Sequence, residues 1–396
     1  MMGDRASDRT EVVTHAKSTR PLRIAVLNRI FKPTGGGAER YSMALVEQLA
    51  QRHEIHVFAQ QIDHHWPGVT YHRVFTPFLR PRWINQLWFA FATWLSTRRG
   101  FDVVHSHENT WHGQVQTVHV VPVKYSLFHG VVGWPLALRW VKIMTSPRLL
   151  AYLGLERSRY RMSKHRRIVV TSGSLQKVMA QTYPLTQSAT SIVTPGVSSV
   201  SGPPSVDEMR AARVRLGLPE EGRCILLVAN DYRKKGLPSL IAAMRHVPED
   251  CYLAVVGNSD QIPGFRQEFV ESQFQHRIHF LGSLRNVDDA YRAADCLVHP
   301  TLEDTFAMVV LEAMAHGVPV VVSGDQFCGI SALLTDANNA LILENPRDAH
   351  ALAEAVIRIL SDKKLALRLI ANGQAFAQRH LWSEIARQQE GIYYAL

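Results

Sequence analysis

The sequence predicts an α/β protein built from two doubly wound, Rossmann-like domains. Three observations support this prediction. The chain has 396 residues, which is too long for one ordinary hydrophobic core and suits two domains. Short apolar runs alternate with longer helical patterns in two successive series. The runs are continuously apolar rather than alternating, as expected of parallel strands that are covered on both faces.

Twelve apolar runs form the predicted strands, six in each half of the chain. The first series consists of 22–28, 54–59, 102–107, 115–120, 167–172 and 190–195. The second series consists of 223–230, 251–257, 277–282, 295–300, 318–323 and 340–343. Between the runs lie stretches such as 38–52, whose apolar residues fall three or four positions apart and predict an amphipathic helix.

The division between the domains is predicted near residue 200, where PGVSSVSGPPS clusters Ser, Gly and Pro and no apolar periodicity survives. The expected units are a first domain over 21–200, a second over 201–376 and a final helix over 377–396. Residues 1–20 are polar and are expected to form a disordered leader without the apolar stretch of a secretion signal. Four widely spaced cysteines without a CxxC pair, and no apolar run of about 18 residues, favour a cytoplasmic protein.

Charge is distributed unequally between the two halves. Residues 1–200 carry 25 Lys and Arg against 10 Asp and Glu, a net charge of +15, whereas residues 201–396 carry 19 against 24, a net charge of −5. The basic half predicts an anionic partner, which could be a nucleic acid, an acidic lipid or a phosphorylated acceptor, although solubility alone would also explain it. Two segments there, 80–99 and 133–167, mix Trp, Leu and Arg, which is typical of interfacial helices and equally of packed core helices.

The first candidate site is the glycine loop TGGGAER, 34–40, between a predicted strand and a predicted helix. Arg40 stands where the dinucleotide-binding fingerprint needs its third glycine, and no GxxxxGK[ST] sequence occurs, which argues against NAD-type and P-loop sites. Glycines without Cβ atoms let a ligand approach the backbone, and free N–H groups at a helix start favour an anion. A tight structural turn would leave the same pattern.

A second candidate site lies in HPTLEDTFAMVVLEAMAHGVPVVVS, 299–323. A strand is predicted to end at His299, a loop carries Asp304, and a helix runs from about residue 307 to 316 before a glycine. The start of this helix offers unpaired N–H groups to a phosphate. Glu312 lies about one turn further in, where its carboxylate suits the vicinal diol of a ribose. The carboxylate of Asp304 is placed to accept from hydroxyls of another sugar.

A basic triplet, Arg233, Lys234 and Lys235, precedes Gly236 where another predicted strand meets a helix. Cations at this position would neutralise a diphosphate as it leaves. Ligands of doubly wound sheets bind at the carboxyl ends of the strands, so the triplet is interpreted as part of the site rather than as a solvated loop.

Four motifs together resemble the retaining glycosyltransferases of family four, which have the GT-B fold of two Rossmann-like domains facing across a cleft. TGGGAERY is similar to the glycine loop of that family, VTPGV at 193–197 to the segment before its interdomain linker, and YRKKGL to its diphosphate site. EDTFAMVVLEAMAHGVPVV resembles the E-x7-E signature and is the most specific of the four, although Asp304 replaces the first glutamate and gives D-x7-E. The resemblance extends from about residue 22 to the C-terminus, and it implies that the final helix packs back on the first domain.

The resemblance also implies roles for individual residues. Glu312 would hold the ribose of a nucleotide sugar, Asp304 would contact the sugar, and His119 in QTVHVVP would orient it. The family often separates its Arg from its Lys by five positions, which points to Asn230, but Arg233 is preferred here as the diphosphate-binding arginine. The predicted catalytic residues are His119, Asp304, Arg233 and Lys235. The predicted donor-binding residues are Gly35, Gly36, Gly37, Arg233, Lys235, Asp304, Phe306, Ala307, Met308, Val309 and Glu312.

The implied activity is transfer of a hexose or related sugar from an NDP-sugar to an acceptor hydroxyl with retention of configuration, in polysaccharide, lipopolysaccharide or glycolipid synthesis. The expected partners are that donor and an anionic or lipid-linked saccharide at the inner face of a membrane, with no nucleic acid and no cofactor. The chain has no D-x-D sequence, which favours a metal-independent enzyme, and the H-x-H pair His105 and His107 is a metal-binding alternative. An NDP-sugar epimerase of the same fold and a non-catalytic sugar-nucleotide sensor remain alternatives.

Overall fold

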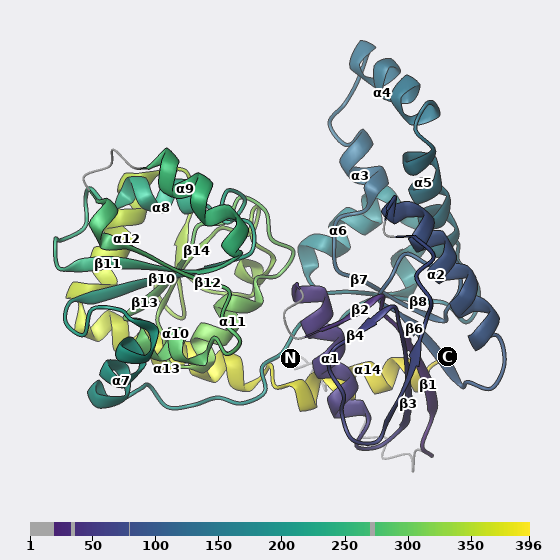
Figure 1. Ribbon diagram of the computed structural model, residues 1–396, viewed down its shortest axis with the longest axis horizontal. Coiled ribbons are helices and arrows are strands. Elements are labelled where there is room, and N and C mark those ends of the chain that lie inside the picture. Colours follow the sequence, from purple (N-terminus) through teal and green to yellow (C-terminus); the bar gives the residue numbers. More distant parts are fainter. Residues whose placement is uncertain (1–19, 33–35, 79, 270–273) are drawn as a thin grey trace, which may run out of the picture.

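The computed structural model describes residues 20–32, 36–78, 80–269 and 274–396, and within them the chain forms two separate parallel sheets, each flanked by helices (Figure 1). In spatial order, the first sheet contains β5 (Val69–Arg73), β3 (Glu54–Ala59), β1 (Arg23–Leu27), β6 (Val103–Ser106), β7 (Val115–Val118), β8 (Arg167–Val170) and β9 (Thr190–Ile192). The second contains β12 (Ile278–Gly282), β11 (Cys251–Gly257), β10 (Arg223–Ala229), β13 (Cys296–His299), β14 (Val320–Ser323) and β15 (Leu341–Leu343).

The predicted fold class is confirmed, because each of the twelve apolar runs contains a strand and every strand pair in the two sheets is parallel. Three strands were not predicted. Strand β5 lies at the sheet edge and is only partly buried, so its sequence VTYHR carries no continuous apolar run. Strands β2 (Ile30–Phe31) and β4 (Gln61–Ile62) form a separate two-residue pairing.

Helices cover the two sheets. Those of the first half are α1 (Gly37–Leu49), α2 (Arg82–Thr97), α3 (Val123–Phe128), α4 (Trp134–Met144), α5 (Pro147–Arg159) and α6 (Gly173–Thr182). Those of the second half are α7 (Val206–Leu216), α8 (Leu237–Ala243), α9 (Ile262–Glu268), α10 (Asp288–Ala293), α11 (Met308–Ala315), α12 (Ala349–Ser361), α13 (Lys363–Gln378) and α14 (Trp382–Tyr394).

The strand order of each sheet reverses once near its centre. In the first sheet the chain moves outward from β1 to β3 and β5 and then returns to place β6 on the other side of β1. In the second sheet β10 occupies the equivalent position, with β11 on one side and β13 on the other. Ligands of doubly wound sheets bind outside the carboxyl ends of the strands at this reversal. The glycine loop follows β1, the basic triplet follows β10, and Asp304 follows β13, so each motif lies at such a point.

The last helix returns to the first domain. Helix α14 packs beside α1, and Trp382, Ile385 and Tyr393 are buried in the hydrophobic core of the first sheet. The chain therefore passes between the domains twice, and the two crossings touch. Val197 donates its backbone N–H to the carbonyl of His380 at 2.9 Å, within the VTPGV segment. A Cβ on neighbouring Gly196 would lie 2.8 Å from that same carbonyl, so the contact requires glycine.

The YRKKGL turn packs directly against the end of β13. Gly236 has φ +78°, which L-residues rarely adopt, and a Cβ there would lie 2.0 Å from the carbonyl oxygen of Pro300. The glycine thus lets the turn that carries the basic triplet approach the loop that carries Asp304.

Replacing Gly236 by alanine is expected to lower the free energy of unfolding by about 2 kcal/mol or more, because it adds both backbone strain and a clash with a carbonyl. Urea denaturation followed by circular dichroism measures the loss. Gly264→Ala is the matched control, since Gly264 lies in α9 and a Cβ there meets nothing within 4 Å. Equal stability of the two variants would contradict this account of the turn.

Candidate functional site

A cavity of about 530 Å³ lies between the carboxyl ends of the two sheets. The first domain contributes the start of α1 together with His119, and the second contributes the loops after β10 and β13 and the start of α11. Of the residues predicted to form the site, the described lining includes Gly36, Gly37, His119, Lys235, Asp304, Phe306, Ala307, Met308 and Val309. Gly35 lies outside the described residues.

Two helix amino termini converge on this cavity. Helix α1 begins after Gly36 and helix α11 begins after Ala307, and neither start has a side-chain cap. A Cβ on Gly37 would lie 3.8 Å from Sδ of Met308, so the two first turns approach each other closely. The first N–H groups of a helix lack partners and carry partial positive charge, so two such starts at one cavity favour an anion.

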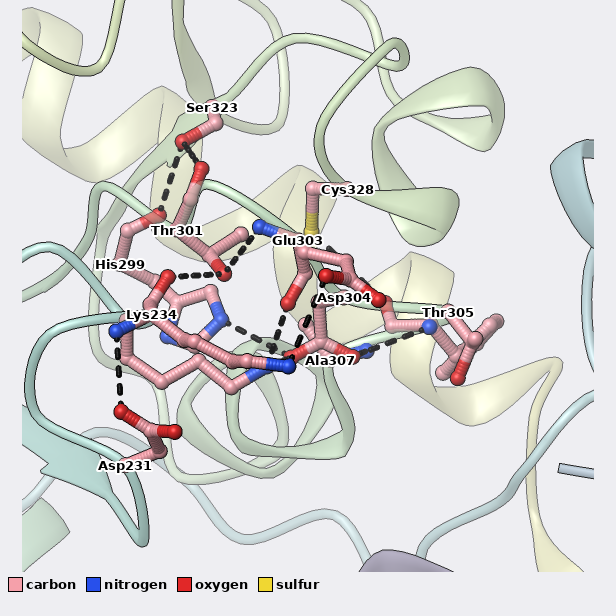
Figure 2. A network of polar contacts seen from close by, with 12 residues as sticks. Asp231, Lys234, His299, Thr301, Glu303, Asp304, Thr305, Ala307, Ser323 and Cys328 are labelled. Atoms are coloured by element: carbon pink, nitrogen blue, oxygen red, sulfur yellow. Dashed lines mark hydrogen bonds and ion pairs between the residues drawn. The ribbon is translucent and has the colours of Figure 1, made fainter. Parts of the chain in front are cut away.

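Asp304 is the centre of a polar network at the second-domain side of the cavity (Figure 2). Its Oδ2 accepts from Nζ of Lys235 at 2.7 Å and from Nε2 of His299 at 3.2 Å. Burial alone would raise the pKa of the Asp304 carboxyl, but the hydrogen bond from His299 and the charge of Lys235 together lower it well below its usual range. Burial lowers the pKa of His299, so its ring is neutral and donates through Nε2 to the ionised carboxylate.

The other oxygen of Asp304 corrects one sequence-based expectation. Oδ1 accepts from the backbone N–H groups of Phe306 at 3.1 Å and Ala307 at 2.8 Å, so these two amides are occupied. The aspartate side chain is short enough to fold back on the chain that follows it, as an Asx turn does. The amides of Met308 and Val309, which the sequence grouped with them, have no hydrogen-bond partner among the described residues and remain open to the cavity.

Arg233 does not line the cavity, contrary to its predicted place in the diphosphate site. Its guanidinium forms an ion pair with Glu268 and lies 5.1 Å from the ring centre of Phe265. Asn230, the position that the family spacing indicates, does line the cavity. Lys235, two residues after Arg233, does line the cavity, because successive residues of this tight turn point in different directions.

Glu312 lies on α11 behind the helix start, and both of its oxygens have partners. The hydroxyl of Tyr291, on α10, donates to Oε2 at 2.6 Å, and Nη1 of Arg40, on α1, donates to Oε1 at 3.0 Å. Arg40 therefore crosses from the first domain to the second. In the sequence Arg40 is recognisable only as a departure from the dinucleotide pattern, and no motif indicates a role for Arg40 or for Tyr291.

Three histidines form a buried group at the carboxyl ends of β6 and β7. Nδ1 of His107 lies 2.9 Å from Nε2 of His119, and the two rings stack. His105 is hydrogen bonded to the hydroxyls of Tyr393 and Thr117, each at 2.6 Å. The described residues contain no group of three His, Cys, Asp or Glu side chains positioned to hold a metal ion. Here His107 positions the ring of His119, which faces the cavity.

The histidine group should make the protein sensitive to acid. Burial lowers the pKa of His105 and of His119 to about 3 and that of His107 well below its usual range. The folded protein keeps all three neutral, whereas the unfolded chain protonates them near pH 6.5. The free energy of unfolding is therefore unaffected by these histidines above pH 6.5. It falls as the pH falls from 6.5 toward 3, by up to about 4 kcal/mol per pH unit for the three groups together, because only the unfolded chain takes up their protons.

Urea denaturation between pH 7 and pH 5 measures the slope of the whole protein, and His107→Asn should lower it by up to about 1.4 kcal/mol per pH unit, the contribution of one histidine, if the variant folds. A free energy of unfolding that stays constant over this pH range would contradict the burial of three neutral histidines.

Two family models match the chain. The model described as "Glycosyltransferase Family 4" matches residues 35–199, and the model described as "Glycosyl transferases group 1" matches residues 208–376. The first match contains the glycine loop and His119, and the second contains Lys235, Asp304 and Glu312.

Curated relatives and solved structures agree with these models. The chain is 30% identical over 212 residues to a D-inositol 3-phosphate glycosyltransferase of Xylanimonas cellulosilytica, covering 51% of this chain and 50% of that one. It is 27% identical over 169 residues to the lipopolysaccharide glucosyltransferase WaaG of Escherichia coli, covering 42% and 44%. The matched region thus spans about half the length of these relatives.

The fold matches over almost the whole chain. A crystal structure of WaaG superposes with a TM-score of 0.79 at 19% identity, covering 93% of this chain and 99% of that one. Anabaena HepE in complex with UDP-glucose superposes with a TM-score of 0.72 at 17% identity, covering 95% and 100%. The chain therefore belongs to glycosyltransferase family four and has the GT-B fold of that family.

Proposed function

We propose that the protein transfers a sugar from an NDP-sugar to an acceptor hydroxyl, with retention of anomeric configuration and without a metal ion. The observation that carries this proposal is the convergence of two uncapped helix starts and Lys235 on one interdomain cavity. These groups suit a diphosphate, which brings two negative charges into a site that already holds the positive ends of two helices. HepE, which has the same fold, was solved with UDP and glucose and with UDP-glucose.

Residues of the cavity, together with Glu312 behind it, suit each part of such a donor. The diphosphate would bind the open amides of Met308 and Val309 and the ammonium of Lys235, which Asp304 holds 2.7 Å away. Glu312, further along α11, would accept from the ribose. The neutral ring of His119 would orient the sugar by hydrogen bonding, since its lowered pKa of about 3 makes it unsuited to act as an acid near neutral pH.

In the reaction the bond from the anomeric carbon to the diphosphate oxygen breaks and a bond from that carbon to the acceptor oxygen forms. The leaving diphosphate takes the acceptor proton, so no protein nucleophile or base is required. Lys235 and the two helix starts stabilise the negative charge that develops on the leaving group. Closure of the domains around the donor excludes water and favours transfer over hydrolysis.

The first domain has a surface suited to an acidic membrane, and we propose that it brings the enzyme to a lipid-linked or anionic saccharide at the inner membrane face. Helices α3 to α5 project away from both sheets (Figure 1). Residues 123–167 carry ten Lys and Arg, of which Arg159 is buried, and one acid, Glu156, which is also buried. On α4 the buried set is Ile143 alone, and the exposed large apolar side chains are Trp134, Leu138, Trp140, Val141 and Met144.

Helix α2 also exposes large apolar side chains. Its buried face includes Phe89 and Ala90 beside the polar Asn85, Gln86 and Thr93, whereas the large side chains of Trp88, Phe91, Trp94 and Leu95 are exposed. The helix therefore carries apolar side chains on its outer face as well as in the core. An aromatic outer face of this kind suits contact with another apolar phase, and the surrounding cations suit acidic headgroups. No described helix has the length and hydrophobicity needed to cross a membrane.

Glu312→Ala is expected to abolish the rise in melting temperature that the best-bound NDP produces in the wild-type protein, because the ribose loses its carboxylate partner. Thermal shift assays with UDP, GDP and ADP identify that nucleotide and measure the change. Glu354→Ala, at an exposed position on α12, is the control and should retain the full shift. An unaltered shift in Glu312→Ala would contradict the proposed donor orientation.

The membrane surface is tested by flotation with liposomes that contain acidic phospholipid. The double variant Trp134→Ser, Trp140→Ser should lower the partition coefficient at least roughly tenfold, because two large apolar side chains no longer enter the interface. Trp66→Ser, which removes an exposed tryptophan elsewhere in the first domain, should bind like the wild type. Failure of the wild-type protein to float at low salt would count against this surface.

A further inference from the structure

Glu312, the predicted partner of the donor ribose, is covered in this structure. Arg40 is among the described residues that line the cavity, whereas Glu312 is not. Both oxygens of Glu312 are engaged, one by Arg40 at 3.0 Å and the other by the hydroxyl of Tyr291 at 2.6 Å. A ribose inside the cavity would therefore meet the guanidinium of Arg40 before it reached the carboxylate.

The two partners of Glu312 differ in how readily they can leave. Tyr291 belongs to the same domain, is 1% exposed and packs in the core of that domain, so its hydrogen bond is part of the fold. Arg40 belongs to the other domain, lies in the first turn of α1, and its side chain is 34% exposed. Rotation of this side chain, or a small opening of the domains, frees Oε1 while Tyr291 continues to hold Oε2. Arg40 is thus the exchangeable partner.

A diphosphate would give the released guanidinium a new partner. Among the described lining residues Arg40 and Lys235 are the two cations, and each is paired with a carboxylate, so neither charge is free in this structure. Arg40 also extends from the start of α1, where a Cβ on Gly37 would lie 3.8 Å from Met308 at the start of α11. The guanidinium is therefore beside the place where the two helix starts would hold the phosphates.

We propose that Arg40 is an exchange residue for the donor. In the free protein it ties the two domains together through Glu312. When an NDP-sugar binds, the ribose hydroxyls take over Oε1 of Glu312, and the guanidinium of Arg40 moves to the diphosphate. The exchange replaces one ion pair by another and couples recognition of the ribose to recognition of the phosphates. It rests on the proposed function in that the ligand is a nucleotide sugar.

Uridine and UDP, or the matching nucleoside and diphosphate of whichever base the thermal shift assays identify, separate the two halves of the exchange, since the nucleoside has the ribose but no phosphate. Calorimetric titration of Arg40→Ala should show uridine binding at least about five-fold tighter than in the wild type, because the competitor for Glu312 is gone. The affinity advantage of UDP over uridine should shrink, because the diphosphate loses a cation. Arg52→Ala is the matched control: Arg52 follows α1 and pairs with Glu390 at 2.7 Å, and both affinities should stay unchanged.

Uridine binding that is unchanged or weaker in Arg40→Ala would overturn the competition for Glu312. An unchanged advantage of UDP over uridine would overturn the move to the diphosphate. A second measurement needs no ligand: hydrogen–deuterium exchange of the free protein should be faster in 37–41 and 308–312 in Arg40→Ala, and also in Glu312→Gln. Unaltered hydrogen–deuterium exchange in both variants would overturn the claim that the Arg40–Glu312 pair ties the two domains together. If the wild type binds no nucleotide but hydrogen–deuterium exchange is faster in these variants, the proposed function is refuted. The Arg40–Glu312 pair between the domains is then still supported.

Discussion

The site depends on one electrostatic constraint, which is that the starts of α1 and α11 face each other across a cavity with no side-chain cap on either. A helix start leaves N–H groups without partners and concentrates partial positive charge, and two such starts at one cavity favour an anion there. The Asp304 carboxylate accepts from Phe306 and Ala307 at the start of α11 and not from Met308 or Val309. Ala307, from which α11 starts, has a left-handed φ of 70°. The fold therefore places the two switch points of its sheets where a diphosphate would complete the interaction.

The carboxylates around this cavity hold the cations in position when no anion is bound. Asp304 holds Lys235, and Glu312 holds Arg40. Each pair is partly buried and accepts further hydrogen bonds, His299 and two backbone amides in one case and Tyr291 in the other. Truncating one member of such a pair leaves an uncompensated charge, so these residues contribute to the stability of the fold. The replacement of the first family glutamate by Asp304 is consistent with this holding role, because the shorter carboxylate reaches back to its own loop.

Much of the fold could be predicted from the sequence, because buried parallel strands have continuously apolar sequences. The partly buried edge strand β5 does not have such a sequence and was missed. Asp304 and Lys235 were placed at the cavity because strand ends and helix starts can be located from continuous apolar runs, and His119 because QTVHVVP resembles a family motif. Arg233 could not be placed, since the direction of each side chain in a tight turn depends on φ and ψ. The Arg40–Glu312 pair spans 272 positions and two domains, so no local pattern indicates it.

The most direct test of the central claim is a crystal structure of the protein with UDP. The account predicts diphosphate oxygens within hydrogen-bond distance of the backbone amides of Met308 and Val309 and of Nζ of Lys235, with the phosphates between the starts of α1 and α11. A UDP molecule bound outside this cavity, or one whose diphosphate points into solvent while the two helix starts face an empty space, would contradict it.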